Sequence, residues 1–276
     1  MIVKWLVEKY DEDVEKLLQS LEKSKIKFEL LPSSLCYLSK YDYFKDDECV
    51  VFYGSLEAAR QVQRLTKWIP GVYGNFNNFK CSKYFSYLGK YLLNSDYAML
   101  PMMEFSRRRE EIYNKYGVNG NVFIRPNSGL KTFNGFILNY DKIDEEFKFL
   151  RTYAKRDLDD IIAVVSSFKS IEVEWRMVVV DREVISSSRY MLRGEENYRS
   201  GGEEGAISFA KKIAEGVWQP DFAYTIDICR SGGNYYLLEA NSFSCSGLYL
   251  CSLEAVVKAV SDAALKEWKE YNEVML

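Results

Sequence analysis

Residues 223–249 read AYTIDICRSGGNYYLLEANSFSCSGLY, and this stretch has the pattern of two paired strands. Apolar and polar residues alternate on both sides of Ser231-Gly232-Gly233, which has the composition of a tight turn. Successive side chains of a strand point to opposite faces, so Asp227, Glu239 and Asn241 are expected to share one face. The stretch therefore predicts an antiparallel hairpin that brings two carboxylates and one amide together.

The two carboxylates need a positive group between them, because acidic side chains at cross-strand distance repel one another. A magnesium ion fits this need, since it prefers oxygen ligands and requires no histidine. A structural alternative is equally open: Asp227 and Glu239 would be edge-strand charges paired with Arg230 or Lys211. The spacing alone leaves both interpretations standing.

A second polar turn lies upstream, in the segment NVFIRPNSGLKTFNGFIL at 121–138, which reads as strand, glycine turn and strand. Glycine and small hydroxyl residues leave backbone N–H groups accessible to an anion, and nearby cations would complete the charge balance. The alternative is a plain β-turn in which Lys131 is solvated.

The composition excludes several kinds of site. The chain has 276 residues and no histidine, which removes Ser–His–Asp and Cys–His catalysis and histidine-ligated zinc. Its formal net charge is −3, so no overall positive field attracts nucleic acid. The six cysteines form no C-x-x-C pair, and no apolar run suits a signal peptide or a membrane span. We expect a cytoplasmic protein with reduced thiols and without nucleic-acid or membrane partners.

The order of the predicted elements indicates the class of the fold. The first 80 residues read as strand, helix, strand, strand and helix, which predicts a small parallel α/β unit. Its turn Tyr53-Gly54-Ser55 is a candidate ligand-binding edge without the G-x-G-x-x-G spacing of dinucleotide-binding proteins. Later segments alternate between helices and hairpins, one of which turns at Asp181-Arg182. Loops are expected at 68–79 and at 190–205, so the whole chain is predicted to be α+β.

The loop at 190–205 carries a second group of cations. Arg193 and Arg199, with the hydroxyl of Ser200, could clamp a carboxylate. The alternative is a surface flap without a ligand.

The motif at 226–248, I-D-I-C-R-S-x-x-x-x-Y-L-L-E-A-N-S-F-S-x-S-G-L, resembles the last motif of the ATP-grasp superfamily. It is similar in particular to ligases that add glutamate to the C-terminus of a ribosomal protein. The resemblance implies that Asp227, Glu239 and Asn241 coordinate Mg²⁺ ions that bridge the phosphates of ATP. The family usually has S-P-G where this chain has Ser244-Cys245-Ser246-Gly247, a departure that concerns the acceptor side of the site.

Two further segments match the superfamily in the same order along the chain. The glycine turn resembles the loop that lies over the ATP phosphates, with arginine in the place of the usual lysine, as in a phage-associated subgroup. Residues 164–191 resemble the hinge that receives adenine and the hairpin that follows it. The resemblance assigns phosphate contacts to Arg125, Ser128, Gly129 and Lys131, the hinge to Val165, Ser166, Ser167 and Phe168, nucleotide-facing positions to Glu174 and Arg176, and an acyl-phosphate contact to Arg189.

The resemblance implies an ATP-grasp fold over 81–276, with a glycine-loop subdomain at about 81–163 and a magnesium-binding subdomain at about 164–276. The α/β unit at 1–80 would precede it. The implied activity is an ATP- and Mg²⁺-dependent ligase that joins a carboxylate to an amine through an acyl-phosphate, on an amino acid, a peptide or another small molecule. Its catalytic cations would be Arg125, Arg176 and Arg189. The alternative is a protein that binds ATP on the same fold without ligation, such as a kinase-like or nucleotide-sensing module.

Overall fold

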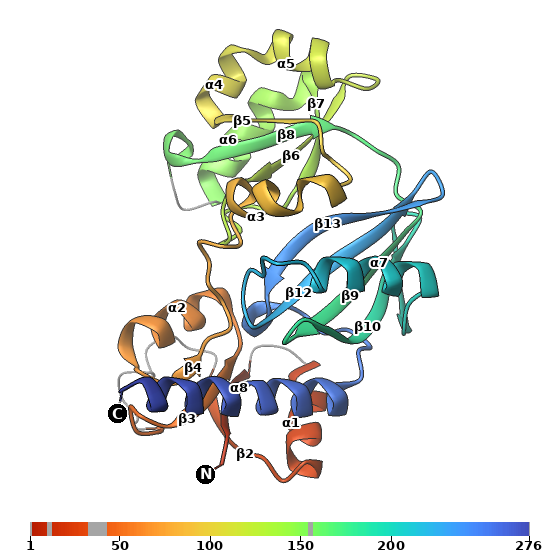
Figure 1. The fold of residues 1–276 in the computed structure, drawn as a ribbon. Coiled ribbons are helices and arrows are strands. Elements are labelled where there is room, and N and C mark those ends of the chain that lie inside the picture. Colours follow the sequence, from red (N-terminus) through yellow and green to blue (C-terminus); the bar gives the residue numbers. More distant parts are fainter. Residues whose placement is uncertain (1, 10–12, 33–42, 154–156, 276) are drawn as a thin grey trace. The chain divides into compact units, whose positions relative to one another are not determined.

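The structure, a computed structural model, describes residues 2–9, 13–32, 43–153 and 157–275 (Figure 1). The chain forms two compact units. The first unit joins Met1–Asn75 to Glu172–Leu276, and the second unit is Phe76–Ile171. The first unit thus combines the expected α/β segment with most of the expected magnesium-binding subdomain. The boundaries near 80 and 163 stay predictions.

A parallel sheet of four strands begins the first unit, in the order β2-β1-β3-β4. Its central strand β3 is buried along its whole length, as expected for a strand in a parallel sheet. Helix α2 starts at Ser55, whose hydroxyl accepts the N–H of Ala58 at 3.2 Å. Strand β4 corrects the loop expected at 68–79, because three of its residues extend the edge of the sheet. The bounds are β1 Lys4–Lys9, α1 Asp13–Lys23, β2 Lys27–Pro32, β3 Cys49–Tyr53, α2 Leu56–Leu65 and β4 Ile69–Gly71.

An antiparallel sheet of five strands completes the first unit, in the order β11-β10-β9-β12-β13. Both expected hairpins form, and the two residues at the tip of each turn, Asp181-Arg182 and Gly232-Gly233, have positive φ angles. The loop expected at 190–205 is wrong in part, because β11 pairs with β10 inside it. The bounds are β9 Val173–Val180, β10 Glu183–Leu192, β11 Glu195–Ser200, α7 Glu204–Ala214, β12 Ala223–Ser231, β13 Asn234–Ser242, the 3-10 helix η4 Phe243–Cys245 and α8 Leu253–Met275.

Helix α7 packs on one face of this antiparallel sheet, which we call the α7 face (Figure 1). The contact is close: a Cβ at Gly205 would lie 2.4 Å from the ring of Tyr235. Part of the other face is apolar and shares one core with the parallel sheet and α8, in which Trp5, Val178 and Val256 are buried together. The rest of that face is free to carry polar side chains.

The second unit is built on an antiparallel sheet of four strands, in the order β5-β8-β6-β7. One face is packed in an apolar core that includes Phe105, Ile124 and Val165. Alternate residues of β6, among them Phe123 and Arg125, point away from this core. The bounds are α3 Cys81–Leu88, η1 Gly89–Tyr91, β5 Tyr97–Pro101, α4 Met102–Arg107, α5 Arg109–Tyr116, β6 Asn121–Pro126, β7 Phe136–Asn139, η2 Tyr140–Lys142, α6 Ile143–Tyr153, η3 Leu158–Asp160 and β8 Ile162–Ser167.

The described cysteines form no disulfide, and four of the five, Cys49, Cys81, Cys229 and Cys251, are buried. This agrees with their expected role as small core residues. Cys36 lies outside the described residues. Every helix in the described ranges is too short or too polar to span a lipid bilayer.

Candidate functional site

Five polar residues share the part of the antiparallel sheet that lies opposite the α7 face. In strand register, Asp227 stands directly across from Arg176 on one side and from Glu239 on the other. Side chains at paired positions point to the same face, and residues two apart along a strand do so as well. The alternation read from the sequence therefore places these groups together. We call them the acidic face: Glu174 and Arg176 on β9, Asp227 on β12, and Glu239 and Asn241 on β13.

A buried ion pair stands at the centre of the acidic face. Arg176 donates from Nε to Oδ1 of Asp227 at 2.5 Å and from Nη2 to Oδ2 at 2.9 Å, and both side chains are buried. Its third donor, Nη1, reaches the carbonyl oxygen of Gly247 at 2.9 Å. Burial alone lowers the pKa of Arg176, but the charge and hydrogen bonds of Asp227 more than reverse this, so the guanidinium stays charged.

This ion pair replaces the structural alternative considered for the hairpin. Arg230, named as a partner for the two carboxylates, instead binds Glu172 at 2.8 Å and Glu203 at 2.6 Å. The partner of Asp227 comes from the neighbouring strand β9, which is distant in sequence from the hairpin. Reading the hairpin alone could not identify it.

The remaining acids of the face carry more negative charge than Arg176 can balance. Glu174 accepts the hydroxyl proton of Tyr190 at 2.7 Å. Its pKa is raised, mainly by burial and also by the negative charges of Asp227 and Glu239, although the bond from Tyr190 lowers it. Three carboxylates therefore surround one guanidinium, and the site favours a further cation.

The oxygen atoms of the acidic face suit a hard divalent cation. Among the described residues, no three histidine, cysteine, aspartate or glutamate side chains are placed to hold a metal ion. The donor set of Asp227, Glu239 and Asn241 differs, because an amide takes the third place. Asn241 donates from Nδ2 to Oε1 of Glu239 at 2.8 Å, which leaves its amide oxygen as the atom it can offer a cation. Such a set fits Mg²⁺, which takes its remaining ligands from water and phosphate.

Three tyrosines stack beside the ion pair. The rings of Tyr190 and Tyr249 are 5.0 Å apart and nearly parallel, and Tyr198 lies 5.6 Å from Tyr249. The Cζ atom of Arg176 lies 5.2 Å from the ring centre of Tyr249, within reach of a cation–π interaction. Sequence reasoning missed these tyrosines, because they come from three segments that no spacing connects. They hold the guanidinium against Asp227.

The serines of the segment after Asn241 attach it to the parallel sheet. Ser242 Oγ donates to the carbonyl oxygen of Tyr73 at 2.7 Å, and Ser244 Oγ to that of Phe52 at 2.7 Å. Tyr53 donates its hydroxyl to the carbonyl oxygen of Ser246 at 2.8 Å. The departure from S-P-G thus has a structural consequence, since the hydroxyl groups fix the end of β13 and the acidic face with it.

The sequence of residues 106–259 matches the family model of an ATP-grasp domain, clade family 2. This match covers more than half of the chain. The chain belongs to this ATP-grasp family. The resemblance of its last motif is thereby confirmed, while the association with phages stays a prediction. No curated protein matches the sequence.

Solved structures of similar fold extend over nearly the whole chain. The ATP complex of D-alanine–D-alanine ligase from Bacillus anthracis is 14% identical, with a TM-score of 0.60, and the match covers 98% of this chain and 99% of that one. D-cycloserine synthetase DcsG is 13% identical, with a TM-score of 0.60 and coverage of 95% and 99%. A RimK domain ATP-grasp protein from Sphaerobacter thermophilus is 12% identical, with a TM-score of 0.56 and coverage of 98% of both chains. At these identities the likeness establishes the ATP-grasp fold, as predicted.

Arg189 requires a correction within this ATP-grasp fold. It stands across from Trp175 in the strand register, whereas Arg176 stands across from Ser188. Arg189 therefore points to the α7 face, away from Asp227 and Arg176. The pairing of β9 with β10 is irregular in two places, and such shifts change which residues share a face. The sequence pattern could not reveal this.

In the second unit, two predicted ATP-binding residues share the face that points away from the apolar core. Arg125 pairs with Val164, and Ser166 pairs with Phe123, so Arg125 and Ser166 lie on the same face of β6 and β8. Ser167 alternates to the core side, and Phe168 follows the end of β8 with 38% of its surface exposed. A hinge here would therefore use backbone groups, as the resemblance implies for Val165 to Phe168.

The glycine turn forms a tight turn after β6. The N–H of Lys131 donates to the carbonyl oxygen of Ser128 at 3.1 Å, and the N–H of Leu130 donates to its hydroxyl at 3.1 Å. A Cβ at Gly129 would lie 2.4 Å from the carbonyl oxygen of Phe76, so this position requires glycine for packing. The glycine thus has a structural explanation of its own, and phosphate binding by the turn stays a prediction.

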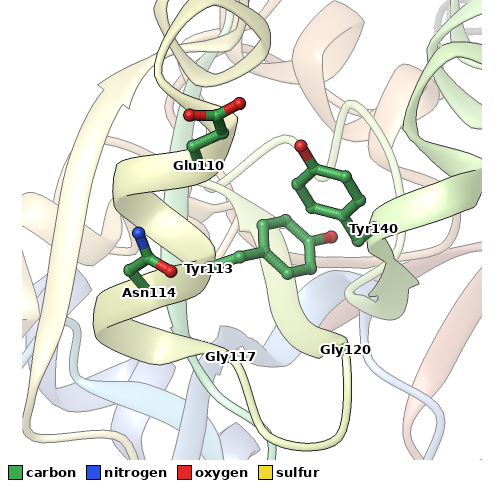
Figure 2. Close-up of a pocket in the computed structure, with 6 residues that line it drawn as sticks. All are labelled: Glu110, Tyr113, Asn114, Gly117, Gly120 and Tyr140. Atoms are coloured by element: carbon green, nitrogen blue, oxygen red, sulfur yellow. The ribbon is translucent and has the colours of Figure 1, made fainter.

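A separate pocket of about 370 Å³ opens in the second unit (Figure 2). The rings of Tyr113 and Tyr140 meet edge to face across it, with centres 5.1 Å apart. The pocket includes Gly120 at the start of β6, whereas the glycine turn follows the end of that strand. None of the predicted site residues lines it; the lining consists of Glu110, Tyr113, Asn114, Gly117, Gly120 and Tyr140.

Proposed function

We propose that this ATP-grasp protein is an ATP- and Mg²⁺-dependent ligase that joins a carboxylate to an amine through an acyl-phosphate. The acidic face carries the proposal, because Asp227 and Glu239 stand opposite each other with the amide of Asn241 beside them. Family membership supports it. The similar structures include D-alanine–D-alanine ligase and the ATP-grasp ligase PsnB, one of whose structures contains a precursor, Mg and ADP.

The proposed cofactors are ATP and Mg²⁺. Asp227, Glu239 and Asn241 would hold Mg²⁺, and the ion would neutralise phosphate charge. Glu174 would face the nucleotide from the same side of β9. In the second unit, the backbone of Ser166, Ser167 and Phe168 would receive adenine, and phosphate contacts would come from Arg125, Ser128, Gly129 and Lys131.

The reaction would consist of two displacements. A carboxylate oxygen of the first substrate would attack the γ-phosphorus, the bond to the bridging oxygen would break, and ADP would leave. The amine nitrogen would then attack the acyl carbon, lose its proton and expel phosphate. Arg125, Lys131 and Arg176 would stabilise the negative charge, and such electrostatic positioning supplies most of the catalysis in phosphoryl transfer. The absence of histidine is therefore no obstacle.

The acyl-phosphate can be tested without knowing the natural amine. The purified chain is incubated with ATP, Mg²⁺ and a panel of amino acids and short peptides, with hydroxylamine as a general nucleophile that converts an acyl-phosphate into a hydroxamate. We expect ADP and hydroxamate in equal amounts with at least one carboxylate. The variant Glu239→Ala should lose both products, whereas Glu183→Ala, at an exposed carboxylate of the same sheet, should retain them. ADP formed without hydroxamate throughout the panel would contradict the ligase.

One observation favours a second candidate, an ATP-binding protein that does not ligate. Both carboxylate oxygens of Asp227 already accept hydrogen bonds from Arg176, so the acid is partly neutralised before any metal binds. This candidate predicts that ATP binds with similar affinity in the presence and absence of Mg²⁺ and that no ADP forms. Calorimetric titration of ATP with Mg²⁺ or with a chelator separates the two candidates.

A further inference from the structure

A second pocket opens on the α7 face of the antiparallel sheet, within the first unit. It measures about 230 Å³, and Trp175, Arg189 and Arg199 line it together with Ser200–Glu203 before helix α7. Trp175 alternates with Glu174 and Arg176 along β9, so the pocket and the acidic face lie on opposite sides of the sheet. The pocket is therefore separate from the proposed magnesium site.

The two arginines of this pocket are direct cross-strand neighbours. Arg189 on β10 pairs with Arg199 on β11, and like charges in this arrangement repel each other. Arg189 donates from Nη2 to the side-chain oxygen of Asn197, a neutral group, and from Nε to its carbonyl oxygen at 3.4 Å. Within the residues that the structure describes, neither guanidinium forms an ion pair. The sheet thus holds two positive charges together without an anion between them.

The one carboxylate in the lining is occupied elsewhere. Glu203 accepts hydrogen bonds from Nη1 of Arg230 at 2.6 Å and from the hydroxyl of Tyr235 at 3.0 Å. Although it precedes the first residue of α7, its side chain forms no capping hydrogen bond with the helix. The positive end of the helix dipole thus adds to the field of the two arginines.

We infer that this pocket binds an anion, the carboxylate or phosphate group of a small molecule, between Arg189 and Arg199. A bridging anion turns the repulsion of the two guanidinium groups into two charge-assisted hydrogen-bonded contacts. The indole of Trp175 supplies a buried apolar floor for the body of the ligand. The sequence had suggested a carboxylate clamp from Arg193, Arg199 and Ser200, and the structure replaces Arg193 with Arg189.

The hairpin offers a matched control for this site. Arg193 has positive φ and lies at the turn between β10 and β11, is exposed, and does not line the pocket. Arg193→Gln and Arg199→Gln remove the same charge from the same hairpin. Only the second removes a wall of the pocket. Arg189→Gln removes the other wall and serves as an independent second variant.

The test is a titration of the isotope-labelled full chain with inorganic phosphate and, separately, with acetate, followed by NMR. Low ionic strength limits screening, and the absence of ATP and Mg²⁺ makes the result independent of the proposed ligase. We expect saturable shifts of the Trp175 indole N–H and of the Gly201 and Gly202 amides. Arg199→Gln and Arg189→Gln should weaken binding at least about tenfold, as expected for one charged hydrogen bond, and Arg193→Gln less than about twofold.

The outcomes separate the sources of the anion. Tighter binding of phosphate assigns the pocket to a phosphorylated ligand, and tighter binding of acetate assigns it to a carboxylate. Equal weakening by Arg193→Gln and Arg199→Gln would reduce the effect to general charge and overturn the inference. Absence of saturable shifts at these three groups with both anions would also overturn it.

Discussion

The two faces of the antiparallel sheet carry opposite charges, although the same strands build both. On the acidic face, three carboxylates surround the guanidinium of Arg176, while the α7 face holds two arginines side by side. Ser188 and Arg189 are neighbours in sequence, yet Ser188 stands across from Arg176 and Arg189 across from Trp175. One step along a strand therefore changes the sign of the field that a side chain meets.

The comparison also shows that the two faces are compensated differently. The acidic face contains its own cation, since Arg176 satisfies both oxygens of Asp227. On the α7 face, Arg189 donates only to neutral oxygens, those of Asn197, among the residues within the described ranges. A cation at the first face would add to an existing pair, whereas an anion at the second would form the first one. Removing single charges is the direct way to test this difference.

The largest effect is expected from Arg176→Met, which leaves Asp227 buried without its partner. We expect the free energy of unfolding to fall by about 3–5 kcal/mol, the usual result of breaking a buried ion pair on one side. Urea denaturation followed by fluorescence measures it. The double variant Arg176→Met with Asp227→Leu should lose less than the single variant, because no uncompensated charge remains. A double variant that loses more would show that packing, and not charge, dominates at this position.

The next effect concerns activity, and Glu239→Gln is the variant that tests it. Glutamine keeps an oxygen for the hydrogen bond from Asn241 but removes the charge that would face Mg²⁺. Turnover of ATP with Mg²⁺ should fall on the order of 100-fold, while the melting temperature stays near that of the wild type. Steady-state ADP release and a thermal melt measure the two quantities. Unchanged turnover would remove Glu239 from the metal site.

The sequence predicted the acidic face well because local rules determine it. A glycine turn and alternating apolar residues fix the hairpin of β12 and β13, and with it the pairing of Asp227 with Glu239. The parallel sheet and the hairpin at Asp181-Arg182 follow from equally local signals. The ATP-grasp fold could therefore be predicted before any long-range contact was known.

Long-range register and segment meetings could not be predicted in the same way. The partner of Asp227 lies 51 positions earlier in the chain, and nothing near either residue specifies the pair. Arg189 was assigned to the wrong side because two irregularities interrupt the pairing of β10 with β9. The stack of Tyr190, Tyr198 and Tyr249 arises only when three separate segments meet. These features depend on tertiary packing and not on periodicity.

A moderate effect is expected from Arg125→Ala, which tests whether the cation on β6 contacts the nucleotide. Loss of a hydrogen bond to a charged group should weaken ATP binding by about 1.5–3 kcal/mol. Calorimetric titration of ATP measures it, with Arg151→Ala, an exposed arginine on α6 of the same unit, as the control. If both variants bind ATP equally well, Arg125 does not belong to the site.

The smallest effect compares the acidic face with a buried acid that lacks a cation. Burial raises the pKa of Glu267 on α8 from its usual 4.5 to about 7, although Tyr73 donates a hydrogen bond to it at 2.6 Å. The folded state then binds the proton more tightly than the unfolded state, so this residue makes the free energy of unfolding fall as pH rises from about 4.5 to about 7. Glu267→Gln removes this loss: it should match the wild type near pH 4 and exceed its stability by about 2 kcal/mol above pH 7, after allowance for partial exposure. Urea denaturation across this pH range measures the difference, with Glu270→Gln, an exposed neighbour on the same helix, as the control. A difference that does not change with pH would show that Glu267 has no raised pKa and that a buried carboxylate here needs no compensating charge.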